Sequence, residues 1–377
     1  MMSSNDNLSP MPMLIVDGHE DIAWNMITFG RDYRRTVAET RQWERGTGTP
    51  EHNGDTLLGW DAYQRGKVAV VLATIFAAPQ RRCEEKGWDT QCYEDALQAY
   101  QLYRAQLDLY HRLCEEHQDT YRLIKTVDEL NEVAGNWRDD AELEHPIGLV
   151  VLMEGAEAIG DPADLEEWWI GGVRVIGPAW AGTRFCGGTL EPGPLTKDGF
   201  LLLEGMAEFG FILDLSHMDE PAALEALDTY PGRILVSHAN AKVLLKGTDS
   251  NRHLSDRVIR GLIERDAVIG IVPMNPFLRA GWERKLGNRR EEVTLERVAN
   301  QIDYICQMAG DPLHAGLGSD FDGGFGLQSA PMDVDDIADL HKLIPLLESY
   351  GYSEVDIRAI LGGNWLTLLG QALPKTV

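Results

Sequence analysis

Eight short apolar runs, separated by stretches with helical periodicity, are the feature of this 377-residue sequence that most restricts its fold. Each run is rich in Val, Ile and Leu and is bounded by turn residues, which is typical of strands buried on both faces of a parallel sheet. The runs begin at Met13, Lys67, Ile147, Val173, Phe211, Arg233, Val268 and His314. Eight such strands alternating with helices predict an α/β fold, a (β/α)8 TIM barrel.

Helical patterns fill most of the sequence between these runs. The clearest cover residues 93–117, 197–209, 255–265, 294–308 and 334–350. The closing stretch begins with Ser353 as a helix N-cap and carries a Gly-Gly interruption, and we expect it to pack outside the barrel.

The length fits one large barrel with insertions, so we expect a single domain over residues 13–377 and a disordered or loosely held segment over residues 1–12. Segments 28–66 and 77–91 fit neither a strand nor a helix, and each follows a strand. In a barrel such connections lie at the C-terminal face, where ligands bind. They are either substrate loops or variable surface insertions, and the sequence does not separate these two readings.

The charge balance restricts the partners. Sixty acidic against 34 basic residues give a formal net charge of −26, which repels nucleic acid and anionic lipid surfaces. The N-terminus lacks a basic start with an apolar stretch, and no apolar run is long enough to span a membrane. The five cysteines are scattered without a Cys-x-x-Cys pair, so we expect no disulfide framework, a reducing compartment and a cytoplasmic protein.

Six polar side chains stand where five of the predicted strands end. In chain order they are His19, Asp21, Glu154, His217, His238 and Asp320. The C-terminal ends of barrel strands converge on one mouth, so we expect these groups to share one site. Carboxylates and imidazoles crowded in one pocket require a cation to stabilise them, which predicts a metal centre.

The three histidines, Glu154 and Asp21 provide more ligands than one catalytic zinc ion needs, because such an ion takes about three protein ligands. Two ions are the simpler solution, with Glu154 bridging them through its two oxygens. Ions about 3.5 to 4 Å apart would hold a bridging water and lower its pKa enough to supply hydroxide. Nitrogen and oxygen ligands without thiolate favour zinc, and manganese and iron stay open.

The motifs "VDGHEDIAWN", "SHM", "SHAN", "GSDFDGG" and "GGNWL", with the Glu154 strand, resemble the membrane dipeptidase (renal dipeptidase) family of the amidohydrolase superfamily. The resemblance extends from about residue 14 to residue 370. It implies a first zinc on His19, Asp21 and Glu154, and a second on Glu154, His217 and His238.

The resemblance also implies roles for two further residues. Asp320 would be the acid/base that takes a proton from the bridging water and passes it to the leaving amine. Arg252, in "DSNRHLSD", would grip the terminal carboxylate of the substrate. A guanidinium gives a carboxylate two parallel hydrogen bonds, which lysine cannot reproduce.

The sequence departs from the family pattern at two positions near these motifs. Trp180, in "GPAWAGT", stands where the family usually has a histidine that stabilises the oxyanion, and Glu20 replaces a usual asparagine. Loss of an oxyanion donor commonly costs about two or three powers of ten in rate.

We therefore expect a metal-dependent dipeptidase that carries two zinc ions, acts on a small dipeptide and tolerates a D-residue at the C-terminal position. Three alternatives stay open: a hydrolase of small N-acyl amino acids, a deaminase or lactonase of the same superfamily, and a metal-binding pseudoenzyme, for which Trp180 is the only argument. We expect neither a nucleic-acid nor a membrane partner, and a homodimer stays open.

Overall fold

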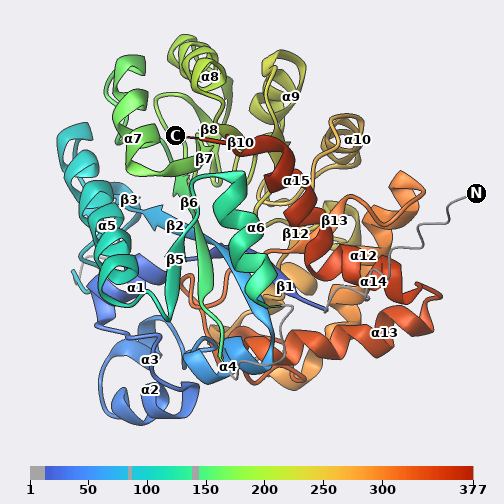
Figure 1. Ribbon diagram of the computed structural model, residues 1–377. Helices are drawn as coiled ribbons and strands as arrows, with labels where there is room; N and C mark the ends of the chain where they lie inside the picture. The colour runs from blue at the N-terminus through green and yellow to red at the C-terminus, as the bar shows by residue number, and fades with distance from the viewer. Residues whose placement is uncertain (1–12, 84–86, 138–143, 377) are drawn as a thin grey trace, which may run out of the picture.

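The computed structural model describes residues 13–83, 87–137 and 144–376, and the barrel is the centre of the molecule (Figure 1). Every predicted run contains one barrel strand. The strands are β1 (Ile15–Glu20), β2 (Val68–Phe76), β6 (Ile147–Glu154), β7 (Val173–Gly177), β10 (Ile212–Asp214), β11 (Ile234–Leu235), β12 (Ile269–Ile271) and β13 (Ala315–Leu317). The predicted segment 1–12 lies outside the described residues.

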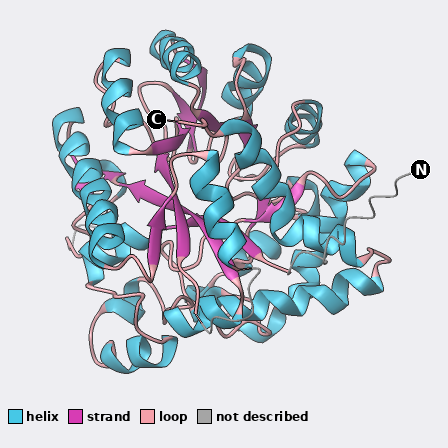
Figure 2. Ribbon diagram, in the orientation of Figure 1, coloured by secondary structure: helices cyan, strands magenta, loops and turns pink. Residues whose placement is uncertain are grey.

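The eight strands are parallel and run in the order β11-β10-β7-β6-β2-β1-β13-β12. Backbone bonds close the ring, because Val236 N donates to Val268 O (2.9 Å) and Gly270 N donates to Val236 O (2.8 Å). A short strand, β5 (Tyr121–Leu123), pairs with β6 beside the ring. Figure 2 shows the strands enclosed by helices, and the (β/α)8 prediction is confirmed.

Close packing inside the barrel depends on glycine at two positions. A Cβ at Gly270 would lie 2.0 Å from the Ser237 carbonyl oxygen, and one at Gly318 would lie 1.8 Å from the same oxygen. Neither distance is sterically allowed, so glycine lets the ends of β11, β12 and β13 approach one another.

The outer helices follow the predicted patterns. The main ones are α5 (Ala96–Glu116), α6 (Val127–Asn136), α7 (Leu165–Gly171), α8 (Lys197–Phe209), α9 (Glu220–Thr229), α10 (Asp256–Glu264) and α12 (Leu295–Ala309). The predicted helix 334–350 is instead a 3-10 segment, η7 (Ile337–Lys342), followed by α13 (Leu343–Ser349).

The C-terminal stretch packs outside the barrel, as predicted. It consists of α14 (Glu354–Arg358), a π-helical segment at the Gly-Gly interruption, η8 (Ala359–Gly363), and α15 (Asn364–Ala372). Ser353 caps it, with its hydroxyl accepting from Asp356 N. The Trp365 indole donates to Leu317 O (2.9 Å), which fixes α15 against β13.

The expectation that segments 28–66 and 77–91 lack regular structure is wrong. After α1 (Ile22–Phe29), the first forms α2 (Val37–Trp43), α3 (Thr49–His52) and α4 (Trp60–Arg65), and the second contains β3 (Ala78–Pro79), which pairs with β4 (Cys92–Tyr93). Helices of four to seven residues are too short to display a period of 3.6.

The expectation of unpaired cysteines is wrong for one pair. Cys83 and Cys92 form a disulfide, while Cys114, Cys186 and Cys306 are free. The pairing of β3 with β4 brings the two sulfurs together, a contact that sequence spacing does not reveal. Disulfides persist mainly in oxidising compartments, so a cytoplasmic location remains only a prediction. Among the described residues, no helix has the length and apolar character needed to cross a membrane.

Candidate metal centre

The six polar side chains predicted at strand ends meet at the C-terminal mouth of the barrel. His19 lies at the centre of one half: its Nε2 is 3.7 Å from Asp21 Oδ2, 3.8 Å from Glu154 Oε2 and 4.0 Å from Asp320 Oδ1. These four residues come from the ends of three strands, β1, β6 and β13, and the barrel brings them together as the sequence predicted.

Two histidines form the other half of the cluster. Nε2 of His217 lies 3.1 Å from Glu154 Oε1, and Nε2 of His238 lies 3.5 Å from the same oxygen. The two Nε2 atoms are 2.9 Å apart. Glu154 therefore presents one oxygen to His19 and the other to this histidine pair.

Backbone conformation aims two of these side chains into the mouth. His217 has φ 65° and Asp320 has φ 55°, in the left-handed region that non-glycine residues seldom adopt. The Asp320 turn is fixed by its N–H, which donates to His19 O (3.1 Å). Such strained conformations concentrate at functional sites, and here each lies three residues after a barrel strand, β10 or β13.

The donor atoms fit a divalent cation. His19, Glu154 and His238 form one group whose candidate ligand atoms all lie within 4.8 Å of one another, and His19, Asp21 and Asp320 form a second. Asp21 Oδ1 and Glu154 Oε1 are buried with no hydrogen-bond donor. Leaving such an acceptor unpaired costs about 1–3 kcal/mol, and more for a charged group, so a cation is the natural partner.

The pKa directions agree with this fit. Burial raises the pKa of Glu154 well above its usual value and lowers the pKa values of His217 and His238 well below theirs. Burial also raises the pKa of Asp320 to about 7. Burial thus leaves these two histidines neutral, as metal ligation requires. Burial lowers the pKa of His19, but the neighbouring carboxylates, Glu154 foremost, raise it to about 10, so this imidazole takes up a proton where these negative charges meet.

Hydroxyl groups behind the histidines fix their rings. Ser237 Oγ donates to Asp214 Oδ2 (2.5 Å) and lies 2.8 Å from Nδ1 of His238. Because the hydroxyl proton is used by Asp214, Ser237 accepts the Nδ1 proton, and Nε2 of His238 is left with its lone pair toward the mouth. Thr189 Oγ1 lies 2.9 Å from Nδ1 of His217.

Sequence reasoning missed these supporting residues, although a signal exists. Each of the two histidines follows a serine, in "LSHM" and "VSHA", and Asp214 stands two residues before the first serine. The serine hydroxyls share that one carboxylate, since Ser216 Oγ donates to Asp214 Oδ1 (2.8 Å).

Sequence reasoning also missed Asp322, which connects segment 28–66 to the turn that carries Asp320. The buried Asp322 carboxylate accepts from Thr56 Oγ1 (2.5 Å) and Leu57 N (2.9 Å), and forms an ion pair with Arg31 (2.9 Å). The segment therefore packs onto the mouth of the barrel rather than extending away from it.

Arg252, the arginine singled out by the family resemblance, lies beside the histidine pair. It is 4% exposed, and its Nη2 donates to His238 O (2.7 Å). Its Nε and Nη1 atoms are buried without a hydrogen-bond acceptor. Arg252 and His217 line the same small cavity, of about 10 Å³. Unpaired guanidinium N–H groups are donors of the kind that carboxylates accept from.

Trp180 and Glu20, at which the sequence departs from the family pattern, lie in different surroundings. The Trp180 ring is half-buried at the mouth, with its centroid 5.1 Å from that of Phe76 and 6.2 Å from that of His217. Glu20 is buried away from the mouth, where Tyr63 OH donates to it (2.5 Å), and burial raises its pKa well above the usual value. Of these two residues, only Trp180 lies where it can contact a molecule bound at the metal centre.

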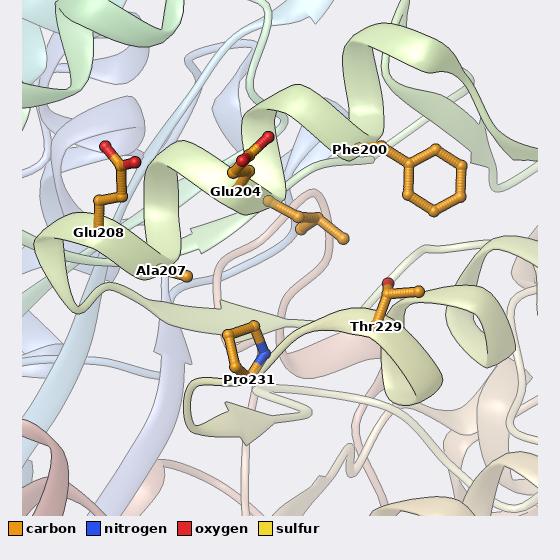
Figure 3. Close-up of a pocket in the computed structure, with 7 residues that line it drawn as sticks. Phe200, Glu204, Ala207, Glu208, Thr229 and Pro231 are labelled. Atoms are coloured by element: carbon orange, nitrogen blue, oxygen red, sulfur yellow. The ribbon is translucent and has the colours of Figure 1, made fainter.

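A separate groove of about 460 Å³ lies in the outer helix layer between α8 and α9. Figure 3 shows its lining, which includes Phe200, Glu204, Thr229 and Pro231. None of the predicted site residues lines it, so it has no part in the chemistry at the barrel mouth.

A (β/α)8 barrel with this donor set at its C-terminal mouth defines a metal-dependent hydrolase. The chain belongs to the membrane dipeptidase family (peptidase family M19), whose model matches residues 10–374. Membership makes it a metal-dependent dipeptidase and confirms the resemblance drawn from the motifs.

Relatives and solved structures agree with this family. An uncharacterized protein of Klebsiella pneumoniae, from the pqqA 5' region, is 31% identical over 233 residues, 59% of this chain and 81% of that protein. An uncharacterized dipeptidase of Schizosaccharomyces pombe is 25% identical over 362 residues, 93% of this chain and 79% of that protein. A Rhodobacter sphaeroides metallopeptidase, solved with a phosphinate mimic of the dipeptide L-Ala-D-Ala, shares the fold, with a TM-score of 0.75, 23% identity, and coverage of 95% of this chain and 99% of that one.

Proposed function

We propose that this protein hydrolyses the amide bond of dipeptides with two zinc ions held at the barrel mouth. The observation that carries the proposal is the orientation of the Glu154 carboxylate. Its Oε2 faces His19, and its Oε1 faces His217 and His238. His19, Asp21 and Glu154 would hold one ion, and Glu154, His217 and His238 the other. When bound, the ions would supply an activated water and polarise the scissile carbonyl.

Asp320 is the proposed acid/base. Its Oδ1 lies 4.0 Å from Nε2 of His19, so its carboxyl group reaches the same space as the proposed ligands. A carboxyl group whose pKa is raised to about 7 by burial can both accept and release a proton near neutral pH. Asp320 would take the proton of the attacking water and pass it to the leaving amine nitrogen.

Arg252 is the proposed clamp for the C-terminal carboxylate of the substrate. Its Nε and Nη1 atoms are buried and unpaired, and each forms an edge of the guanidinium with Nη2. On the edge that the bond from Nη2 to His238 O leaves free, one of these atoms and the second N–H of Nη2 would give two parallel donors to the two carboxylate oxygens. The single bond from Nη2 to His238 O holds the guanidinium in place before substrate arrives. A free carboxylate one residue from the scissile bond would thus define the dipeptide.

We extend the proposal to dipeptides with a D-residue at the C-terminal position. The support is the Rhodobacter sphaeroides relative, which carries a phosphinate mimic of L-Ala-D-Ala. The carboxylate clamp itself does not depend on the configuration of the neighbouring carbon.

The test is hydrolysis of matched L,L and L,D dipeptides by the purified, zinc-loaded protein, beside N-acetyl amino acids and a lactone. We expect release of free amino acids from dipeptides, and a loss of at least about a hundredfold in kcat for Asp320→Asn with its metal retained. Turnover confined to the N-acetyl amino acids or the lactone would overturn the dipeptidase proposal. Absence of all turnover in the metal-loaded protein would favour a pseudoenzyme.

A further inference from the structure

Beside the metal centre lies an apolar cluster that is separate from the barrel core. Trp24, Phe76 and Ala78 are buried in it, and four partly buried residues pack against them: Phe29, Cys83, Trp88 and Trp180. A second small core of this kind is common beneath long loops, where it has a structural role alone. Its position and its partly open rings distinguish this one.

Three aromatic members of the cluster stand at the mouth of the barrel. Phe76 is the last residue of β2, Trp24 lies in α1 just after Asp21, and Trp180 follows β7. The Trp180 ring connects the cluster to the metal centre, because it contacts Phe76 on one side and faces His217 on the other. Trp88 closes the outer end, with its ring centroid 6.2 Å from that of Trp24.

Several of these rings are not fully covered. Trp88, Phe29 and Trp180 are all partly exposed. Of these rings, Trp180 faces the metal centre. Partly exposed aromatic rings offer an apolar ligand group a favourable surface, because its burial there removes further apolar area from water.

The cluster lies across the barrel from the proposed carboxylate clamp. In the ring order, β2 is separated from β11 by three strands on one side and by three on the other. Phe76 ends β2, and Arg252 is held beside His238, just after β11. A substrate whose carboxylate is bound by Arg252 and whose amide bond lies at Glu154 therefore directs its other end toward the aromatic cluster.

We propose that Trp24, Phe76, Trp88 and Trp180 form the subsite for the side chain of the N-terminal residue and select large apolar or aromatic side chains. We call these four residues the aromatic wall. The inference rests on the proposed function, because it takes Arg252 as the carboxylate clamp. It gives Trp180, which lacks the chemistry of an imidazole, a role in specificity.

The first measurement compares Phe-Ala with Gly-Ala, which differ only in the side chain that would meet the aromatic wall. We expect kcat/KM for Phe-Ala to exceed that for Gly-Ala by at least about tenfold, as burial of one aromatic side chain allows. Trp180→Ala should reduce this ratio at least about fivefold, and Trp180→Phe should restore part of it. Phe200→Ala removes an exposed aromatic ring in the distant groove of Figure 3 and should leave the ratio unchanged.

The second measurement is binding without turnover. Dissociation constants of the same two dipeptides are measured by calorimetry on the zinc-loaded Asp320→Asn variant, with and without Trp180→Ala. We expect Phe-Ala to bind more tightly than Gly-Ala, and Trp180→Ala to reduce this difference in affinity. If Trp180→Ala does not fold, as circular dichroism would reveal, Trp180→Leu replaces it.

The outcomes separate this inference from the proposed function. Hydrolysis of both dipeptides with a ratio near one, or with a ratio that Trp180→Ala does not change, refutes the aromatic wall and leaves the dipeptidase proposal intact. If neither dipeptide is hydrolysed, the proposed function fails. The dissociation constants then decide whether the aromatic wall is a side-chain subsite. Equal constants, or no binding of either dipeptide, overturn it.

Discussion

Nε2 of His217 lies 2.9 Å from Nε2 of His238 at the mouth of the barrel. Burial lowers the pKa values of both imidazoles, so the pair is neutral, and Ser237 accepts the Nδ1 proton of His238. At least one lone pair is therefore directed at the space beside Glu154 Oε1, which has no hydrogen-bond donor. A cation between these groups is the arrangement that their chemistry favours.

Ser237→Ala tests this support of the histidine ligand. The substitution removes the acceptor for the Nδ1 proton, which frees the ring to rotate or change tautomer. Loss of such an outer partner typically costs about 10- to 100-fold in metal affinity. We expect that loss in a competition titration with a zinc chelator. Ser349→Ala, at an exposed serine of α13, is the matched control, and equal affinities for the two variants would refute the role of Ser237.

Amidation of the dipeptide C-terminus tests Arg252 as the carboxylate clamp. It removes the anionic partner and leaves the buried guanidinium unsatisfied, which should cost about 2–4 kcal/mol, or roughly 30- to 1000-fold in kcat/KM. Equal kcat/KM values for the acid and the amide would remove Arg252 from this role.

Arg252→Lys supplies an independent check on the same clamp. The carboxylate would be bound alike in the ground state and the transition state, so the variant should raise KM more than it lowers kcat. Arg284→Lys, at an exposed arginine, should behave as the wild type. A loss confined to kcat would contradict the assignment.

The disulfide offers a fourth prediction, because Trp88 lies between Cys83 and Cys92 in the sequence. The double variant Cys83→Ser/Cys92→Ser should hold Trp88 less firmly and lower the preference for Phe-Ala over Gly-Ala. Its metal content should stay at the wild-type level, since neither cysteine contacts the predicted ligands. A fall in metal content with an unchanged preference would contradict this account of the disulfide.

The sequence predicts the barrel and the positions of its charged groups well, for a physical reason. Buried parallel strands leave continuous apolar runs, and the side chains just after them converge wherever such strands close a ring. His19 and Asp320 lie 301 residues apart in the sequence, yet both could be placed at one mouth because each follows such a run.

The contacts that the sequence does not reveal are those that depend on pairing between separate segments of the chain. The Cys83–Cys92 disulfide follows from the contact of two two-residue strands, and the bond between Asp322 and Thr56 joins segments 266 residues apart. The link from Asp214 through Ser237 to His238 depends on the register of β10 against β11. None of these contacts leaves a periodic pattern in one segment.

The number of metal ions per chain tests the central claim most directly. The protein is expressed with zinc in the medium and purified without chelator. Its zinc concentration is measured by inductively coupled plasma mass spectrometry and divided by the protein concentration. We predict close to two zinc ions per chain in the wild type, and well below two in Glu154→Gln, because one residue holds both ions. One ion or none in the wild type, or two ions retained by Glu154→Gln, would contradict the two-ion centre.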